Sequence, residues 1–163
     1  MDDRSKRKSD HSSLFADELA RTVLNSLSAH SAILDENGVI LETNTAWRNY
    51  AVKGGIPEDH DDRGTNYLAV CDATKGSESE NAGKVAEGIR AVIRGEVEEF
   101  LYDYPCYSED GPHWYYMRAI RMSGPGPIRV VASYEEITGL KLSEEALRNK
   151  RTNLRSYLMS ISQ

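Results

Sequence analysis

The segment Ser133–Arg148, which reads SYEEITGLKLSEEALR, decides how the rest of the chain is interpreted. The residues just before it include Ile128, Val130 and Val131, which favour a strand because β-branched side chains suit a pleated, half-buried surface. After a turn at residues 137–139, the sequence becomes rich in Leu, Glu, Lys and Arg, all good helix formers. We therefore predict that the last strand of a sheet passes directly into a helix that serves as the output of the domain.

In this helix an apolar residue recurs every seven positions, at Leu140, Leu147, Leu154 and Ile161. This period predicts one seam of a coiled coil that projects from the body of the domain. A second apolar stripe lies near the N-terminus, with the spacing of an amphipathic helix, at Phe15, Leu19, Val23 and Leu27. An isolated helix with one apolar stripe is marginal in water, so we predict that both terminal helices pair with a second copy of the chain. The alternative is that the C-terminal helix folds back on its own domain.

Between the terminal helices, the chain alternates between apolar runs and turn residues. Two short apolar runs flank Asn37-Gly38, which predicts a hairpin because both residues accept positive φ. Asn44 can cap a helix that carries Trp47 and Tyr50. Residues 66–71 form a short apolar piece, either helical or strand-like. Residues 82–94 have the apolar stripe of a helix, with a glycine directly after it as the stop signal.

Three further strands are expected at residues 96–107, 113–122 and 128–137. Together with the hairpin, this order predicts an α+β fold, a five-stranded antiparallel sheet with short helices on one face. We divide the chain into an expected disordered tail, an amphipathic helix, a body and a signalling helix, at residues 1–13, 14–28, 29–138 and 139–163. Because the predicted helix runs up to the last residue, we expect the chain to be a fragment of a longer protein.

This order of elements resembles that of PAS sensory domains, from about Leu27 to Arg148. Glu136-Ile137-Thr138 is similar to the Asp-Ile-Thr exit of that family, with a conservative change at its first residue. The hairpin at residues 33–40 and the helix entry at residues 43–47 also match. The middle of the chain is similar to a bacterial PAS subgroup through Tyr104-Pro105-Cys106 and Trp114-Tyr115, although that subgroup carries histidine where this chain has Tyr107.

The resemblance implies a pocket enclosed by the helices and the inner face of the sheet. The candidate ligand-binding residues are the aromatic and sulfur residues of those elements, Trp47, Tyr50, Tyr67, Cys71, Tyr102, Tyr104 and Cys106. Ordinary burial in the core is the alternative for each of them, because aromatic and free cysteine side chains are commonly buried. We expect Trp47, Tyr67 and Tyr104 to converge on one cavity. Neither cysteine adjoins a Lys, Arg or His in the sequence, so we expect both to be reduced and unligated.

The identity of any ligand or cofactor stays open. Gly64–Ala69 reads GTNYLA, with tyrosine where flavin photosensors of this fold carry their adduct-forming cysteine, so a photoadduct is not expected. The helix over residues 82–94 contains no histidine, which disfavours haem. We find no nucleophile elbow, no phosphate-cradling glycine loop and no metal-ligand pair at helical spacing, and we expect neither enzymatic activity nor a metal site. The acidic run Glu58–Asp62, which includes His60, is expected to be a solvated loop.

Length and charge narrow the class of protein further. The 163 residues are enough for one domain, and the net charge of −6 argues against a nucleic-acid-binding module. No apolar run approaches the roughly 20 residues needed to span a bilayer. We therefore expect a cytoplasmic, homodimeric PAS sensor that relays the state of a small ligand or partner to a histidine kinase or diguanylate cyclase module. The alternatives are a ligand-free PAS dimerisation module and a haem or flavin redox sensor.

Overall fold

The structure, a computed structural model, describes residues 16–161. Residues 16–26 are helical. The elements that follow are β1 (His30–Leu34), β2 (Ile40–Thr43), α2 (Thr45–Lys53), α3 (Tyr67–Ala73), a 3₁₀ turn η1 (Gly76–Glu78), α4 (Ser79–Arg94), β3 (Glu99–Ser108), β4 (Gly111–Arg121), β5 (Val130–Glu136) and α5 (Thr138–Ser160). Phe15 and the predicted disordered tail of residues 1–13 lie outside the described residues.

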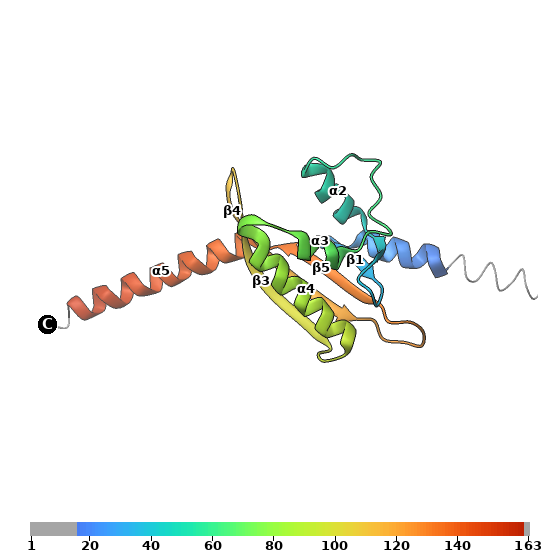
Figure 1. The fold of residues 1–163 in the computed structure, drawn as a ribbon. Coiled ribbons are helices and arrows are strands. Elements are labelled where there is room, and N and C mark those ends of the chain that lie inside the picture. The colour runs from blue at the N-terminus through green and yellow to red at the C-terminus, as the bar shows by residue number, and fades with distance from the viewer. Residues whose placement is uncertain (1–15, 162–163) are drawn as a thin grey trace, which may run out of the picture.

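The five strands form one antiparallel sheet in the order β2-β1-β5-β4-β3. The last strand in the sequence therefore lies in the middle of the sheet, between β1 and β4. Helices α3 and α4 cover one face, and α5 continues from the end of β5 (Figure 1). The predicted α+β fold, a five-stranded antiparallel sheet with short helices on one face and helices at both ends, is confirmed.

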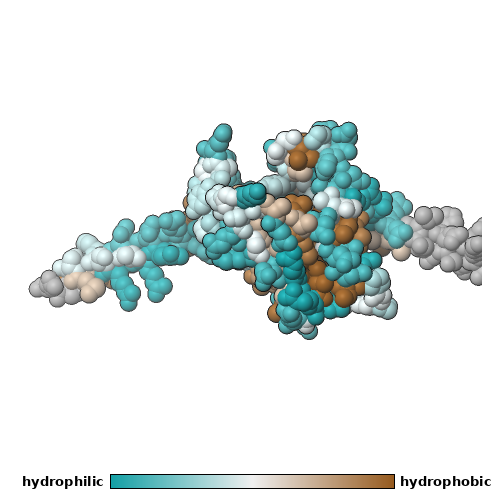
Figure 2. All heavy atoms as spheres, viewed as in Figure 1, coloured by the Kyte–Doolittle hydropathy of each residue, from teal (hydrophilic) through white to brown (hydrophobic). Residues whose placement is uncertain are grey.

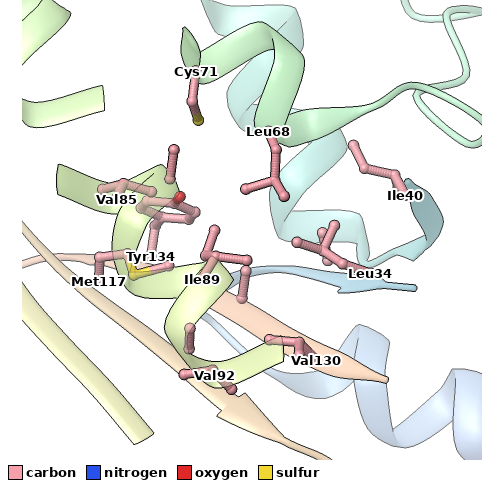
Figure 3. Packing of buried hydrophobic residues seen from close by; sticks show 14 residues of the cluster. Leu34, Ile40, Leu68, Cys71, Val85, Ile89, Val92, Met117, Val130 and Tyr134 are labelled. Carbon is pink, nitrogen blue, oxygen red and sulfur yellow. The ribbon is translucent and has the colours of Figure 1, made fainter. Parts of the chain in front are cut away.

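The core lies between α4 and the inner face of the sheet (Figure 3). Alternate residues of β5 point inward, and Val130 and Ala132 are fully buried there. On α4, Val85, Ile89 and Val92 form the buried stripe that the sequence predicts. A Cβ built on Gly88 would lie 2.3 Å from the Phe100 ring, so the absence of a side chain lets α4 approach β3 closely.

The β1–β2 hairpin forms where Asn37-Gly38 predicts it, but its turn differs from the predicted one. Only Gly38 has a positive φ, of 81°. Asn37 stays in the usual region because the Asp35 carboxylate accepts hydrogen bonds from the backbone N–H groups of Asn37, at 2.8 Å, and Val39, at 2.9 Å. A Cβ on Gly38 would also lie 2.5 Å from Leu68, so the turn needs glycine for its conformation and for the packing of α3.

Helix α4 starts at Ser79, three residues before its predicted start. The additional residues are polar, which is why periodicity alone assigns them to a loop. They are held in the helix by a bond from the Ser79 hydroxyl to the Gly76 carbonyl, at 2.8 Å, and by the Glu80–Lys84 ion pair, at 2.7 Å. The helix ends at Gly95, which has φ 74°, as predicted.

Asn44 joins the N-terminal helical segment to the body. Its side chain is fully buried and its Oδ1 accepts hydrogen bonds from the N–H groups of Ser31 and Trp47, both at 2.9 Å. The bond from Trp47 is the predicted cap of α2. Its Nδ2 donates to the carbonyls of Ala29, at 2.8 Å, and Leu24, at 3.1 Å. One side chain thus fixes α2 and the end of the helix at residues 16–26.

Helix α5 leaves the body and projects away from it (Figure 1). Leu140, Leu147 and Leu154 are 58%, 69% and 59% exposed, so the alternative in which this helix folds back on its own domain is wrong. Paler, less hydrophilic residues gather toward its C-terminal end (Figure 2). Leu19 and Leu27 of the N-terminal stripe are also exposed. None of the helices within residues 16–161 is long and apolar enough to cross a membrane.

Candidate functional site

A cavity of about 370 Å³ lies between α2, α3, the start of α4 and the ends of strands β3, β4 and β5. Trp47, Tyr67 and Tyr104 all line it, as the sequence predicts. Its rim reaches solvent, because the lining residues Tyr50 and Val70 are about half exposed. The volume falls within the range of small-molecule sites in proteins, about 300–1,000 Å³.

Two helix caps position the side chains on the helical wall. The Asn44 cap sets the start of α2 and thereby places Trp47. The Asn66 side chain accepts from the Ala69 N–H, at 3.0 Å, and caps α3 in the same way. Tyr67 and Cys71 lie four residues apart on α3, so they share the face that meets the cavity.

The sheet wall is made of three tyrosines at the same end of adjacent strands. Tyr104 of β3 and Tyr115 of β4 are paired in register, and their rings lie 6.2 Å apart. Tyr134 of β5 follows the alternation of the buried residues Val130 and Ala132 and therefore points to the same face.

The aromatic rings form two groups that meet around the cavity. In the first group, Trp47 lies edge-on to Tyr67, at 5.6 Å, and to Tyr134, at 6.1 Å. In the second group, Tyr50 lies edge-on to Tyr115, at 6.0 Å, and stacks on the His30 ring, at 4.5 Å. Edge-to-face pairs expose ring faces in different directions, so the cavity is bounded by ring faces on several sides.

Few polar groups interrupt this lining. The hydroxyls of Tyr67 and Tyr134 are 2.6 Å apart and share a hydrogen bond. Burial raises the pKa of both well above the ordinary tyrosine value, so both stay protonated. Two hydroxyls that share one bond leave one hydroxyl hydrogen for a further acceptor. The Trp47 indole N–H donates a hydrogen bond to the Asp62 carboxylate, at 2.8 Å. The other polar ring of the lining is that of His30, and burial lowers the pKa of this residue.

Cys71 and Cys106 both line the cavity and form no disulfide. Burial is the main cause that raises the pKa of each thiol. For Cys71 a hydrogen bond from the Tyr67 hydroxyl partly opposes this rise. Both thiols therefore favour the protonated form, which is the weaker nucleophile.

The prediction for Tyr102 is wrong, because its side chain does not line the cavity. Its hydroxyl donates to the Asn81 side chain, at 2.8 Å, and the Lys84 ammonium lies 5.8 Å from its ring centroid. Tyr102 is on the same face of β3 as Tyr104 but lies beneath α4, whereas Tyr104 lies beyond the start of that helix. The other six candidates, which all line the cavity, are Trp47, Tyr50, Tyr67, Cys71, Tyr104 and Cys106.

The sequence reasoning missed several lining residues, among them the ring-bearing residues His30, Tyr115 and Tyr134. Strand alternation carried the signal for the two tyrosines, because each is spaced by two from small or apolar residues that are buried. Nothing in the sequence indicated that His30 lines the cavity, because the position of its ring depends on stacking against Tyr50. Asp62, expected in a solvated loop, also reaches the cavity. Within residues 16–161, no group of three or more His, Cys, Asp or Glu side chains is arranged to hold a metal ion.

The junction between β5 and α5 adjoins the cavity. The Ile137 N–H donates to the Trp114 carbonyl, at 2.7 Å, and the Trp114 N–H donates to the Thr138 hydroxyl, at 3.0 Å. Thr138 in turn donates to Glu136, at 2.9 Å. The start of α5 is thus hydrogen-bonded to β4 at the residue next to Tyr115, a cavity residue.

His113, near the start of β4, is a connecting residue of this junction. Its Nδ1 lies 2.6 Å from the Glu136 carboxylate and its Nε2 lies 3.1 Å from that of Asp110. Hydrogen bonds to these two carboxylates raise the pKa of His113. Lys141 of α5 pairs with Asp103 and lies over the Trp114 ring, at 4.9 Å.

No protein-family model matches the chain. A curated relative, an uncharacterized 104.1 kDa protein in the hypE 3′ region of Rhodobacter capsulatus, is 37% identical over 123 residues. The match covers 74% of this chain and 13% of that protein, so the chain spans about an eighth of the relative's length.

Several solved structures that are similar to this chain in fold are PAS or sensor domains. The PAS domain of Bordetella pertussis BvgS matches with a TM-score of 0.54 at 17% identity, over 83% of this chain and 96% of that one. A PAS domain from Colwellia psychrerythraea matches with a TM-score of 0.50 at 11% identity, over 75% and 97%. The sensor region of a sensor histidine kinase matches with a TM-score of 0.50 at 13% identity, over 69% and 40%. The chain therefore has the PAS fold.

Proposed function

We propose that the chain is a cytoplasmic PAS sensor domain without enzymatic activity of its own, which binds a small molecule in the cavity and relays its presence through α5. The proposal rests on one observation, the closeness along the chain of cavity-lining residues to the residues that hold the start of α5. Tyr134 lines the cavity and lies two residues before Glu136, which begins the junction. A ligand that moves Tyr134 or Tyr115 would therefore act on the hydrogen bonds that fix the start of α5.

The relay needs a helix whose position is free to change. The heptad residues of α5 are exposed, so they are open to pairing with a second copy. If Leu140, Leu147 and Leu154 occupy the a positions, the d positions are Ser143 and Lys150, followed by Tyr157. These d residues pack poorly and leave the pairing adjustable, which suits a helix that shifts or rotates with the state of the sensor.

We further propose that the receiver of this signal is a histidine kinase or diguanylate cyclase module in the full-length protein. The great length of the Rhodobacter relative supports a place for this domain within a larger protein. The similarity to the sensor region of a histidine kinase supports the first of these two modules.

Native mass spectrometry of the purified protein tests ligand binding directly. We expect a retained small molecule in the wild type and its loss in Tyr104→Ala. Tyr107→Ala is the matched control, because Tyr107 lies on the same strand but is 70% exposed and does not line the cavity. Truncation of a buried aromatic costs about 3–5 kcal/mol, so each variant is first checked for folding by circular dichroism.

Two other functions give different results in the same experiments. A ligand-free dimerisation module would retain no small molecule and would still form a dimer through α5. A haem or flavin redox sensor would show the characteristic absorption bands of its cofactor in the visible spectrum. Wild-type protein that is free of small molecules after gentle purification, and that takes none up from a cell extract, contradicts the proposal.

A further inference from the structure

The cavity lining combines aromatic rings with negative charge. Six aromatic residues contribute rings to it, Trp47, Tyr50, Tyr67, Tyr104, Tyr115 and Tyr134. Among the described residues that line it, the formally charged side chains are Asp62 and Glu78, and neither lysine nor arginine is present. Such a lining favours a cation over an anion, because it offers a cation two carboxylates and offers an anion neither lysine nor arginine.

Building on the proposed sensor function, we infer that the ligand is a small organic cation, a quaternary ammonium or methylated amine, held in a cage of aromatic rings. The face of an aromatic ring carries negative potential and attracts a cation placed over it. The edge-to-face contacts of Trp47 with Tyr67 and Tyr134 turn these ring faces in different directions. An approximately spherical cation can therefore meet several faces at once.

The two carboxylates strengthen this preference. The Asp62 carboxylate is fixed beside Trp47, because one oxygen accepts from the indole N–H at 2.8 Å and the other lies 3.0 Å from His60 Nε2. This arrangement holds a negative charge at the edge of the Trp47 ring. Glu78 also lines the cavity, and its charge adds to burial in raising the pKa of Tyr104.

Other classes of ligand fit less well. An anion such as a carboxylate or phosphate would lose water without gaining a basic partner, which is costly in a site lined by apolar rings. His30 does not supply one, because burial lowers its pKa and favours the neutral ring. A neutral aromatic molecule can stack on the same rings but gains no charge–charge attraction to Asp62 and Glu78. The charge of the ligand therefore distinguishes an organic cation from a neutral aromatic molecule.

Isothermal titration with choline and with its neutral carbon isostere, 3,3-dimethylbutan-1-ol, tests this difference. Both molecules have the same shape, so any difference in affinity reports the charge. Loss of cation–π attraction corresponds to about a two- to thirty-fold change per ring, and we expect choline to bind at least about ten-fold more tightly. Benzyltrimethylammonium serves as a second cation that fills more of the cavity.

Variants separate the role of the ring from that of general packing. Tyr104→Leu should weaken choline binding by about two- to thirty-fold, whereas Tyr104→Phe, which keeps the ring, should retain it. Glu78→Gln should weaken the binding of choline but not that of the neutral isostere. Circular dichroism verifies that each variant is folded.

Each outcome decides the inference. Equal affinity for choline and the isostere, or no binding of either cation, overturns it. A neutral or anionic molecule retained in native mass spectrometry also overturns it but leaves the sensor function intact. A cavity that retains nothing and binds neither probe removes the proposed function together with the inference.

Discussion

Replacement of Asn44 by alanine should lower the free energy of unfolding more than loss of an ordinary helix cap. The empty cap of α2 costs about 1 kcal/mol. The buried Ser31 N–H, which donates to Asn44 at 2.9 Å, loses its acceptor at a cost of about 1–3 kcal/mol. Loss of the donors to the carbonyls of Ala29 and Leu24 adds about 1 kcal/mol. We expect a total loss of about 3–5 kcal/mol, a large part of the stability of a typical domain.

Urea denaturation followed by tryptophan fluorescence measures this loss, with the slope m checked for constancy. Asn44→Ser is the matched control, because serine still caps α2 but lacks the amide group that donates to the carbonyls of Ala29 and Leu24. It should fall between the wild type and Asn44→Ala, and it should expose residues 16–26 to protease. A loss below about 1 kcal/mol in Asn44→Ala would refute the role assigned to this side chain.

Three further predictions concern other parts of the fold. Gly88→Ala should cost about 1–3 kcal/mol of stability by overpacking against the Phe100 ring. Phe100→Leu in the same chain should restore part of the lost stability. Additive losses in this double-mutant cycle would contradict the contact. The pKa of His113 is raised and that of Glu136 is lowered, so their contact should stabilise the fold most between about pH 4.5 and 6.5. The contribution of His113 is lost as the pH rises through its folded pKa, and that of Glu136 is lost as the pH falls through its folded pKa. Urea midpoints that vary with pH equally in the wild type and in His113→Asn would count against this. Leu154→Glu should dissociate a dimer without unfolding the body, since each buried leucine contributes about 1.5–3 kcal/mol, and a wild type that sediments as a monomer at high micromolar concentration would rule out the proposed pairing.

Much of the fold follows from local sequence signals. Strand alternation, the Asn-Gly turn and the stop at Gly95 are properties of neighbouring residues, and each element lies within a few residues of its predicted place. The first turn of α4 was missed because its residues are polar, and apolar periodicity carries no signal for polar residues.

The site was predictable only in part, because it depends on contacts between distant elements. Tyr102 and Tyr104 share one strand face, and only the starting point of α4 decides which of them reaches the cavity. The hydrogen bonds from Asn44 to the N-terminal segment are accepted by backbone carbonyls, which every residue has, so the sequence gives no sign of them. Strand alternation did carry a signal for Tyr115 and Tyr134, and weighing it for β4 and β5 would have added both to the candidate site.

Hydrogen–deuterium exchange at the β5–α5 junction tests ligand-controlled output most directly. The amide to follow is that of Ile137, which donates to the Trp114 carbonyl at 2.7 Å. Protein carrying its retained ligand is compared with protein stripped of it by unfolding and refolding. We predict a different exchange rate at Ile137 and along the first turn of α5 in the two states. Identical exchange at the junction, with protection changing only around the cavity, would contradict coupling between ligand and helix.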